Sequence, residues 1–196
     1  MRFSMPAAVL AGGASRRMGS PKGGLPYGTG TLAEHQTARL AEAFSPIWLV
    51  VREDPSFAFA PARLLFDGDR ERSALSGLLR ALEEAEDRVF VLAVDLPLLP
   101  LSVARAMAAA SLGSEAPAVL PEVAGALEPL AGIWRRAALP AAARRAREGR
   151  RSLRGLAEEI GAEPFLEASW RALDPSGNAF TNLNTVQDWA LARERA

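Results

Sequence analysis

The sequence predicts an α/β fold with one domain, in which a mostly parallel, open sheet carries helices on both faces. Short apolar runs alternate with helix-like patterns along the whole chain, which is the βαβ rhythm of such sheets. The clearest run, residues 88–94, is apolar on both faces, as expected for a strand that helices cover on either side. The length of 196 residues corresponds to about one domain, and no linker or composition break divides the chain. Residues 1–196 are therefore expected to form a single domain.

The predicted strands are short apolar segments bounded by turn residues or by the start of a helix. The first, residues 7–10, leads directly into a glycine-rich stretch, and the fourth, residues 88–94, ends at Asp95-Leu96-Pro97. In chain order, the strands are expected at 7–10, 47–51, 63–66, 88–94, 118–120, 130–134 and 165–166.

The predicted helices begin where a capping residue precedes apolar residues at helical spacing. Thr31 and Glu34 have the spacing of a capping box, and Ser73 precedes leucines that share one helix face. With approximate ends, the helices are expected at 32–44, 74–86, 100–110, 139–147, 152–160 and after Thr185, which has Asp188 at its capping-box position.

Composition and charge exclude several classes of protein. The formal net charge is zero, which argues against a general nucleic-acid binder. The chain has no cysteine, so disulfides, thiolate metal sites and cysteine nucleophiles are excluded. No stretch approaches the ~18 apolar residues of a membrane span, and the first apolar run is too short for a signal peptide. We therefore expect a cytoplasmic protein with neither nucleic-acid nor membrane partners.

Residues 9–25 are unlike the rest of the chain. Five of these residues are glycine, Arg16 and Arg17 are adjacent, and Lys22 is the only lysine of the protein. A glycine-rich turn after a strand exposes backbone N–H groups, and basic side chains nearby donate charge-assisted hydrogen bonds to phosphate oxygens. The spacing is neither that of the Walker loop nor that of the dinucleotide-binding G-x-G-x-x-G motif. The stretch predicts a third kind of polyphosphate-binding loop, with a basic surface loop as the alternative.

Two further groups of polar residues stand where ligands bind in such folds. Asp95 ends a buried strand at the sheet edge that the glycine-rich loop also reaches, so its carboxylate is placed to hold Mg²⁺ together with substrate phosphates. Its alternative role is to cap the following turn. Asn182 and Asn184 are two residues apart, so their amide groups can point the same way from an extended segment. Their alternative role is to cap the helix that follows.

These motifs resemble those of the molybdenum cofactor nucleotidyltransferases, and among them most closely the molybdenum cofactor guanylyltransferases. The signature loop matches as Leu10-Ala11-Gly12-Gly13-x-Ser15-x-Arg17-Met18-Gly19-x-x-Lys22. The other matches follow in the order of the family and extend over nearly the whole chain: Asp67 with Leu75-Ser76-Gly77-Leu78, Asp95-Leu96-Pro97, Glu128-Pro129-Leu130, Gly149-Arg150-Arg151-Ser152-Leu153 and Phe180-Thr181-Asn182-Leu183-Asn184-Thr185.

The resemblance implies a Rossmann-like nucleotidyltransferase fold, whose N-terminal part binds the nucleotide and whose C-terminal part faces the pterin. It implies that the terminal phosphate of molybdopterin attacks the α-phosphorus of GTP, so that pyrophosphate leaves and a guanine dinucleotide cofactor forms. GTP, Mg²⁺ and the molybdenum cofactor are the implied ligands, and other cofactor-insertion proteins are the implied partners. The implied roles are nucleotide binding for Leu10, Ala11, Gly12, Gly13, Lys22, Asp67 and Asp95, catalysis for Arg17, Lys22 and Asp95, metal binding for Asp95, and the pterin side for Asn182 and Asn184.

The chemistry of this reaction agrees with the residues. The nucleophile is already an anionic phosphate, so the reaction needs no strong general base. It must bring two anions together and neutralise charge on the leaving pyrophosphate, which arginine, lysine and Mg²⁺ can do. His35 is the only histidine and has no clear use in this mechanism, so we expect a buried structural role for it.

One residue departs from the family pattern, which has an aspartate directly before the loop lysine. Pro21 stands there instead and offers no side-chain acceptor, so a nucleotide-binding adaptor without activity stays open as a hypothesis. Two more enzyme activities also stay open, those of a cytidylyltransferase for the same cofactor and of a sugar-phosphate nucleotidyltransferase. The loops of these enzymes often contain Leu-Ala-Ala-Gly. Gly12, where those relatives have alanine, changes the room beside the base and favours guanine.

Overall fold

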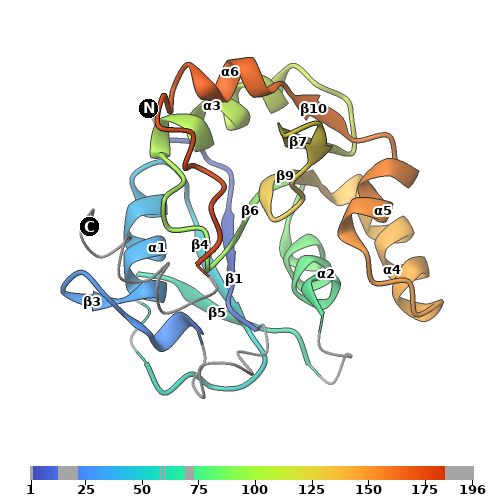
Figure 1. Ribbon diagram of the computed structural model, residues 1–196. Coiled ribbons are helices and arrows are strands. Elements are labelled where there is room, and N and C mark those ends of the chain that lie inside the picture. The colour runs from blue at the N-terminus through green and yellow to red at the C-terminus, as the bar shows by residue number, and fades with distance from the viewer. Residues whose placement is uncertain (1, 13–21, 58, 60, 69–72, 184–196) are drawn as a thin grey trace.

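The computed structural model describes residues 2–12, 22–57, 59, 61–68 and 73–183. Within them the chain forms one open, mostly parallel sheet with helices on both faces, so the predicted fold class is confirmed (Figure 1). The helix predicted after Thr185 lies outside the described residues.

The sheet follows the order β10-β7-β9-β6-β1-β4-β5. All pairings among β1, β4, β5 and β6, and the pairing of β10 with β7, are parallel, whereas β9 runs antiparallel to both of its neighbours. The bounds are β1 (Ala7–Leu10), β4 (Ile47–Val51), β5 (Arg63–Phe66), β6 (Arg88–Ala93), β7 (Ala118–Val123), β9 (Ala131–Arg135) and β10 (Glu163–Phe165).

Alternate residues of the central strand supply two separate cores. Ala7 and Val9 of β1 pack in the core beneath α1 (Leu32–Ala41) and α3 (Leu101–Leu112). Ala8 packs in the core beneath the helices of the other face, which are α2 (Ala74–Glu84), α4 (Leu139–Arg147) and α5 (Leu153–Glu159). Figure 1 shows these two groups of helices on opposite sides of β1 and β6. Burial on both faces explains why the strand sequences are apolar throughout.

Local signals located several elements well. The strands at 47–51 and 63–66 and the helix at 139–147 have the predicted bounds. The capping box of α1 is present: Thr31 Oγ1 accepts a hydrogen bond from the Glu34 N–H at 3.2 Å, and the Thr31 N–H donates to Glu34 Oε2 at 2.9 Å. The capping residue predicted for α2 is also present, because Ser73 Oγ accepts from the Ser76 N–H at 3.2 Å.

Two helices end earlier than predicted, and for one of them a tertiary contact gives the reason. Helix α1 ends at Ala41 rather than near Phe44, since Phe44 forms a parallel bridge with Phe3 and the Ala43 carbonyl accepts from the Phe3 N–H. Helix α2 ends at Glu84. The structure also contains short elements that were not predicted, which are the hairpin β2 (Pro26–Tyr27) and β3 (Gly30–Thr31), the strand β8 (Ala126–Leu127) beside β7, and α6 (Glu167–Arg171).

Among the helices within the described ranges, none combines the length and the apolar character required to cross a lipid bilayer.

Candidate functional site

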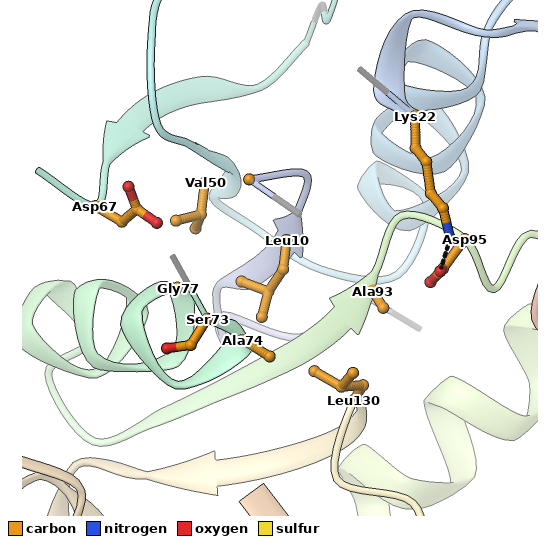
Figure 2. Close-up of a pocket in the computed structure, with 11 residues that line it drawn as sticks. Leu10, Lys22, Val50, Asp67, Ser73, Ala74, Gly77, Ala93, Asp95 and Leu130 are labelled. Atoms are coloured by element: carbon orange, nitrogen blue, oxygen red, sulfur yellow. Dashed lines mark hydrogen bonds and ion pairs between the residues drawn. The ribbon is translucent and has the colours of Figure 1, made fainter. Parts of the chain in front are cut away.

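A cavity opens at the carboxyl ends of the four parallel strands around β1. The chain passes from β1 outward to β4 and β5 and then returns to β6 on the other side of β1, which is the kind of switch point where α/β sheets bind ligands. Figure 2 shows the residues around it. The lining residues are Leu10, Gly12, Lys22, Val50, Asp67, Ser73, Ala74, Gly77, Ala93, Asp95 and Leu130.

The loop lysine and the strand-end aspartate meet directly in this cavity. Lys22 begins a turn of 3-10 helix (Lys22–Gly24), and Asp95 follows β6. The Lys22 Nζ donates to Asp95 Oδ2 at 2.6 Å, and both side chains are about one-fifth exposed, at 21% and 19%. The structure thus brings together two predicted site residues that are 73 positions apart.

The backbone around Asp95 is held by hydrogen bonds from two other parts of the chain. The Val94 N–H donates to the Leu10 carbonyl at 3.1 Å, which ties the turn to β1. The Asp95 carbonyl accepts from the Leu183 N–H at 2.9 Å. This bond brings the C-terminal segment to the same edge of the sheet and leaves Asn182 exposed beside it. Asn184 lies outside the described residues.

Asp67 lies across the cavity from Asp95. It follows β5, is buried at 4% exposure, and its Oδ1 is 3.8 Å from Arg52 Nη1. A Cβ placed on Gly12 would be 3.4 Å from Asp67 Oδ2, so the glycine lets the backbone approach this carboxylate closely. In Figure 2, Asp67 lies on one side of Leu10 and the ion pair of Lys22 and Asp95 on the other.

The remaining predicted residues differ in how the structure places them. Ala11 is buried, its N–H donates to the Val50 carbonyl at 2.9 Å, and it is not among the lining residues. Gly13 and Arg17 lie outside the described residues, as does Pro21. Among the described lining residues, Lys22 is the one cation, and it pairs with Asp95, whereas Asp67 has Arg52 near it.

Several lining residues were not singled out by the sequence analysis for a role in the site. Gly77 was noted only as part of a family motif, but its position has a packing reason. A Cβ there would lie 3.3 Å from Leu10 Cδ2, so glycine allows the first turns of α2 to approach β1.

Leu130 also lines the cavity, and the Glu128 carboxylate accepts from the Leu130 N–H at 3.1 Å. Burial raises the pKa of Glu128, the bond from Leu130 and the charge of Arg154 oppose this rise, and the charge of Asp95 adds to it.

His35 lies on α1 and is not among the residues that line the cavity. Its ring is 4.5 Å from the ring of Tyr27, centroid to centroid, at a tilt of 59°. Burial, and to a smaller extent the positive charge of Arg39, lowers the pKa of His35 from 6.5 to about 4. The imidazole is therefore neutral near pH 7.

The low pKa of His35 predicts a loss of stability in mild acid. The unfolded chain binds a proton near pH 6.5 and the folded chain only near pH 4, so the free energy of unfolding falls as the pH drops between these values. We expect the thermal midpoint to decrease from pH 7 to about pH 4.5 by more in the wild-type protein than in His35→Gln, because most carboxylates titrate below this window. Equal decreases in the two proteins would contradict the assignment.

The chain matches the family model described as the MobA-like NTP transferase domain over residues 7–177. It belongs to the MobA-like NTP transferase family. Two relatives extend over nearly its whole length. A molybdenum cofactor guanylyltransferase of Syntrophotalea carbinolica is 29% identical over 100% of this chain and 93% of its own. A probable molybdenum cofactor guanylyltransferase of Mycobacterium avium is 33% identical over 99% and 98%.

Two solved structures with different names have the same fold as this chain. The molybdopterin-guanine dinucleotide biosynthesis protein A of Archaeoglobus fulgidus superposes with a TM-score of 0.84 at 21% identity, over 97% of this chain and 98% of its own. A 2-C-methyl-D-erythritol 4-phosphate cytidylyltransferase of Thermus thermophilus superposes with a TM-score of 0.65 at 20% identity, over 100% and 98%. The MobA-like chain is thus a nucleotidyltransferase of Rossmann-like fold.

Nucleotidyltransferases of this kind generally use a divalent metal, and the residues of this MobA-like site can be compared with what such a metal requires. Among the described residues, no group of three or more histidine, cysteine, aspartate or glutamate side chains gathers to form a protein cage for a metal ion. Asp95 is a single carboxylate at the end of a strand and lines the cavity. Such a carboxylate suits a cation whose other ligands are substrate phosphates and water. The residues therefore fit a metal that arrives with the nucleotide.

Proposed function

We propose that this chain transfers GMP from GTP to the terminal phosphate of molybdopterin, which releases pyrophosphate and forms the guanine dinucleotide cofactor. The full-length relatives named molybdenum cofactor guanylyltransferase support this reaction and its two substrates. The observation that carries the proposal is the contact of Lys22 with Asp95 at the rim of the cavity, at 2.6 Å. A cation and a carboxylate side by side at the rim of a cavity are the groups that a triphosphate and its metal require, which supports the proposal.

The reaction needs positioning and charge neutralisation rather than proton transfer. An oxygen of the molybdopterin phosphate forms a bond to the α-phosphorus of GTP, while the bond from that phosphorus to the bridging oxygen of the β-phosphate breaks. The electron pair of the broken bond leaves with pyrophosphate. Lys22 donates hydrogen bonds to the triphosphate and offsets its charge, and Arg17 of the same loop has the same role. The neutral His35 takes no part.

Mg²⁺ is the metal that we propose for Asp95, because it prefers one or two carboxylates together with phosphate oxygens. When bound, it would supply positive charge to the phosphates and to the departing pyrophosphate. Asp95 would hold the metal, and Lys22 would then donate to a phosphate oxygen instead of to the Asp95 carboxylate.

The other site residues are assigned to the two substrates. Gly12 and Gly13, with Leu10, form the guanine and phosphate side in front of the buried Ala11, and Asp67 lies near the guanine or ribose. A buried carboxylate there suits the N–H donors of guanine or a ribose hydroxyl. The C-terminal part of the chain forms the pterin side through Asn182 and Asn184, and the hydrogen bond from Leu183 to the Asp95 carbonyl supports this assignment, because it anchors that segment beside the cavity. The cytoplasm and other cofactor-insertion proteins complete the proposed setting.

The proposal is tested by incubating the protein with Mg²⁺, molybdopterin and either GTP or CTP, and by measuring pyrophosphate and the dinucleotide product. We expect kcat/KM for GTP to exceed that for CTP by more than about tenfold, since a site that hydrogen-bonds one base leaves polar groups unpaired with another. Faster turnover of CTP would overturn the guanine assignment. Binding of GTP without turnover, unaffected by Asp95→Ala, would instead identify a nucleotide-binding adaptor.

A further inference from the structure

Helix α1 carries two polar side chains on the face that packs toward the turn after β6. Gln36 is fully buried, at 0% exposure, and its Nε2 donates to the Val94 carbonyl at 3.4 Å. Arg39 lies one turn further along the helix, and its Nη1 donates to the Pro97 carbonyl at 2.9 Å. Its Nη2 donates to Gln36 Oε1 at 2.9 Å, which joins the two side chains into one unit.

The two carbonyls that receive these bonds lie on either side of Asp95. Val94 immediately precedes it and Pro97 follows two residues later, while the Asp95 carbonyl itself accepts from the Leu183 N–H. Helix α1 and the C-terminal segment therefore hold the backbone before, at and after the aspartate. The direction of the Asp95 side chain depends on this backbone, because its carboxylate is only two bonds from Cα.

The same helix also holds the position of the lysine that meets Asp95. The N–H of Leu32, the first residue of α1, donates to the Leu25 carbonyl at 2.9 Å. The Leu25 N–H in turn donates to the Lys22 carbonyl at 3.1 Å. Hydrogen bonds thus connect the segments of both Lys22 and Asp95 to the same helix, α1.

A polar pair in this place is costly, which calls for a reason beyond packing. Burying the Gln36 amide fully and the Arg39 side chain in part costs free energy that hydrogen bonds only partly return, and ordering two long side chains costs entropy. Burial lowers the pKa of Arg39, against the charges of Tyr27 and Glu42. Apolar residues such as the neighbouring Leu40, at 1% exposure, would fill a core-facing position without that cost.

We propose that Gln36 and Arg39 are positioning residues for Asp95, which hold its turn at the place where the carboxylate meets Lys22 and, in the proposed function, the metal. The inference rests on the proposed function only for the metal, since the contact with Lys22 is part of the structure itself. Groups that orient a metal ligand from behind are usually worth about 10- to 100-fold in metal affinity.

The chain offers a matched control in Arg136, which also donates to backbone carbonyls. Its Nη1 donates to Glu83 at 2.9 Å and to Ala85 at 2.7 Å, at the end of α2 and just before β6. This lies at the amino end of β6, away from the cavity. Arg136→Met therefore removes an arginine with similar bonds, and Arg39→Met and Gln36→Met remove the two proposed positioning groups.

The first measurement needs neither nucleotide nor metal. Lys22 is the only lysine of the chain, so reductive methylation with ¹³C-formaldehyde gives one side-chain methyl signal besides that of the N-terminal amine. We expect this signal in Arg39→Met and in Gln36→Met to move from the wild-type position toward that of Asp95→Asn, in which the ion pair is lost. Arg136→Met should keep the wild-type signal.

The second measurement is the affinity of the GTP-loaded protein for Mn²⁺, followed by electron paramagnetic resonance. We expect Arg39→Met to weaken it by about tenfold or more and Arg136→Met to leave it unchanged. Arg39→Lys, which keeps the charge and can reach one carbonyl, should lie in between and tests the inference if Arg39→Met does not fold. Wild-type values of both the methyl signal and the Mn²⁺ affinity in Gln36→Met and in either Arg39 variant would overturn the inference. If the wild-type protein does not turn over GTP, the proposed function is wrong, but the methyl signal of Lys22 still tests whether Gln36 and Arg39 position Asp95.

Discussion

Replacing Asp95 with asparagine is expected to lower kcat/KM for guanylyl transfer by about a thousandfold. The substitution keeps the shape of the side chain but removes the negative charge that pairs with Lys22 at 2.6 Å and that, in the proposed function, binds the metal. A metal that neutralises transferring phosphates contributes several kcal/mol to the rate, and each 1.4 kcal/mol corresponds to about tenfold. Initial rates of pyrophosphate release at saturating Mg²⁺ give the measurement.

The fold should survive this change, which separates a loss of chemistry from a loss of structure. Both side chains of the ion pair are about one-fifth exposed, and partly exposed pairs contribute about 0–1 kcal/mol to stability. The thermal midpoint of Asp95→Asn should therefore stay close to that of the wild-type protein. A variant that keeps more than a tenth of the wild-type rate would argue against a metal at Asp95.

Replacing Lys22 with methionine is expected to lower kcat/KM by about 10- to 100-fold, mainly through a higher KM for GTP. A charge-assisted hydrogen bond contributes about 1.5–3 kcal/mol, and methionine keeps most of the length of the side chain without the charge. Lys22→Arg should restore part of the affinity, because the cation returns. The measurement is the dependence of the initial rate on GTP concentration for the three proteins.

The double variant of Lys22 and Asp95 gives a further check on this second prediction. Because the two side chains contact each other and, in the proposed function, act on the same phosphates, their losses should be less than multiplicative. Full multiplicativity would mean that each residue acts on its own. An unchanged KM for GTP in Lys22→Met would place the triphosphate elsewhere.

Local signals predicted much of the fold. The capping box at Thr31 and the serine before α2 join residues three positions apart, so they can be recognised in the sequence. Both appear as hydrogen bonds in the structure. The end of α1 is different. Its last predicted turn is replaced by the bridge between Phe3 and Phe44, and a contact between residues so distant in the chain has no local signature. The short strand β8 and the helix α6 were missed for a different reason, since elements of two to five residues carry too little periodicity to recognise.

The site also contains residues that the sequence predicted and residues that only the structure revealed. Lys22 and Asp95 were predicted together because parallel strands end at one edge of the sheet, and a loop and a turn that follow such strands share that edge. Gly77 and Leu130 came from motifs whose purpose became clear only when α2 and β9 were seen to pack beside β1 and β6. Gln36 and Arg39 gave no signal at all, because nothing in a helical pattern reveals which carbonyls lie 58 residues away.

The sequence by itself determined the α/β architecture, the family and the residue types at the cavity, because these depend on hydrophobic periodicity, glycine-rich turns and ordered motifs that read along the chain. Only the tertiary structure decided that Lys22 reaches Asp95, that Asp67 lies on the other side of Leu10, and that α1 holds the turn that carries Asp95. The physical reason is that patterning specifies which face of an element is buried. The distance between two side chains is set by how several such faces pack at once.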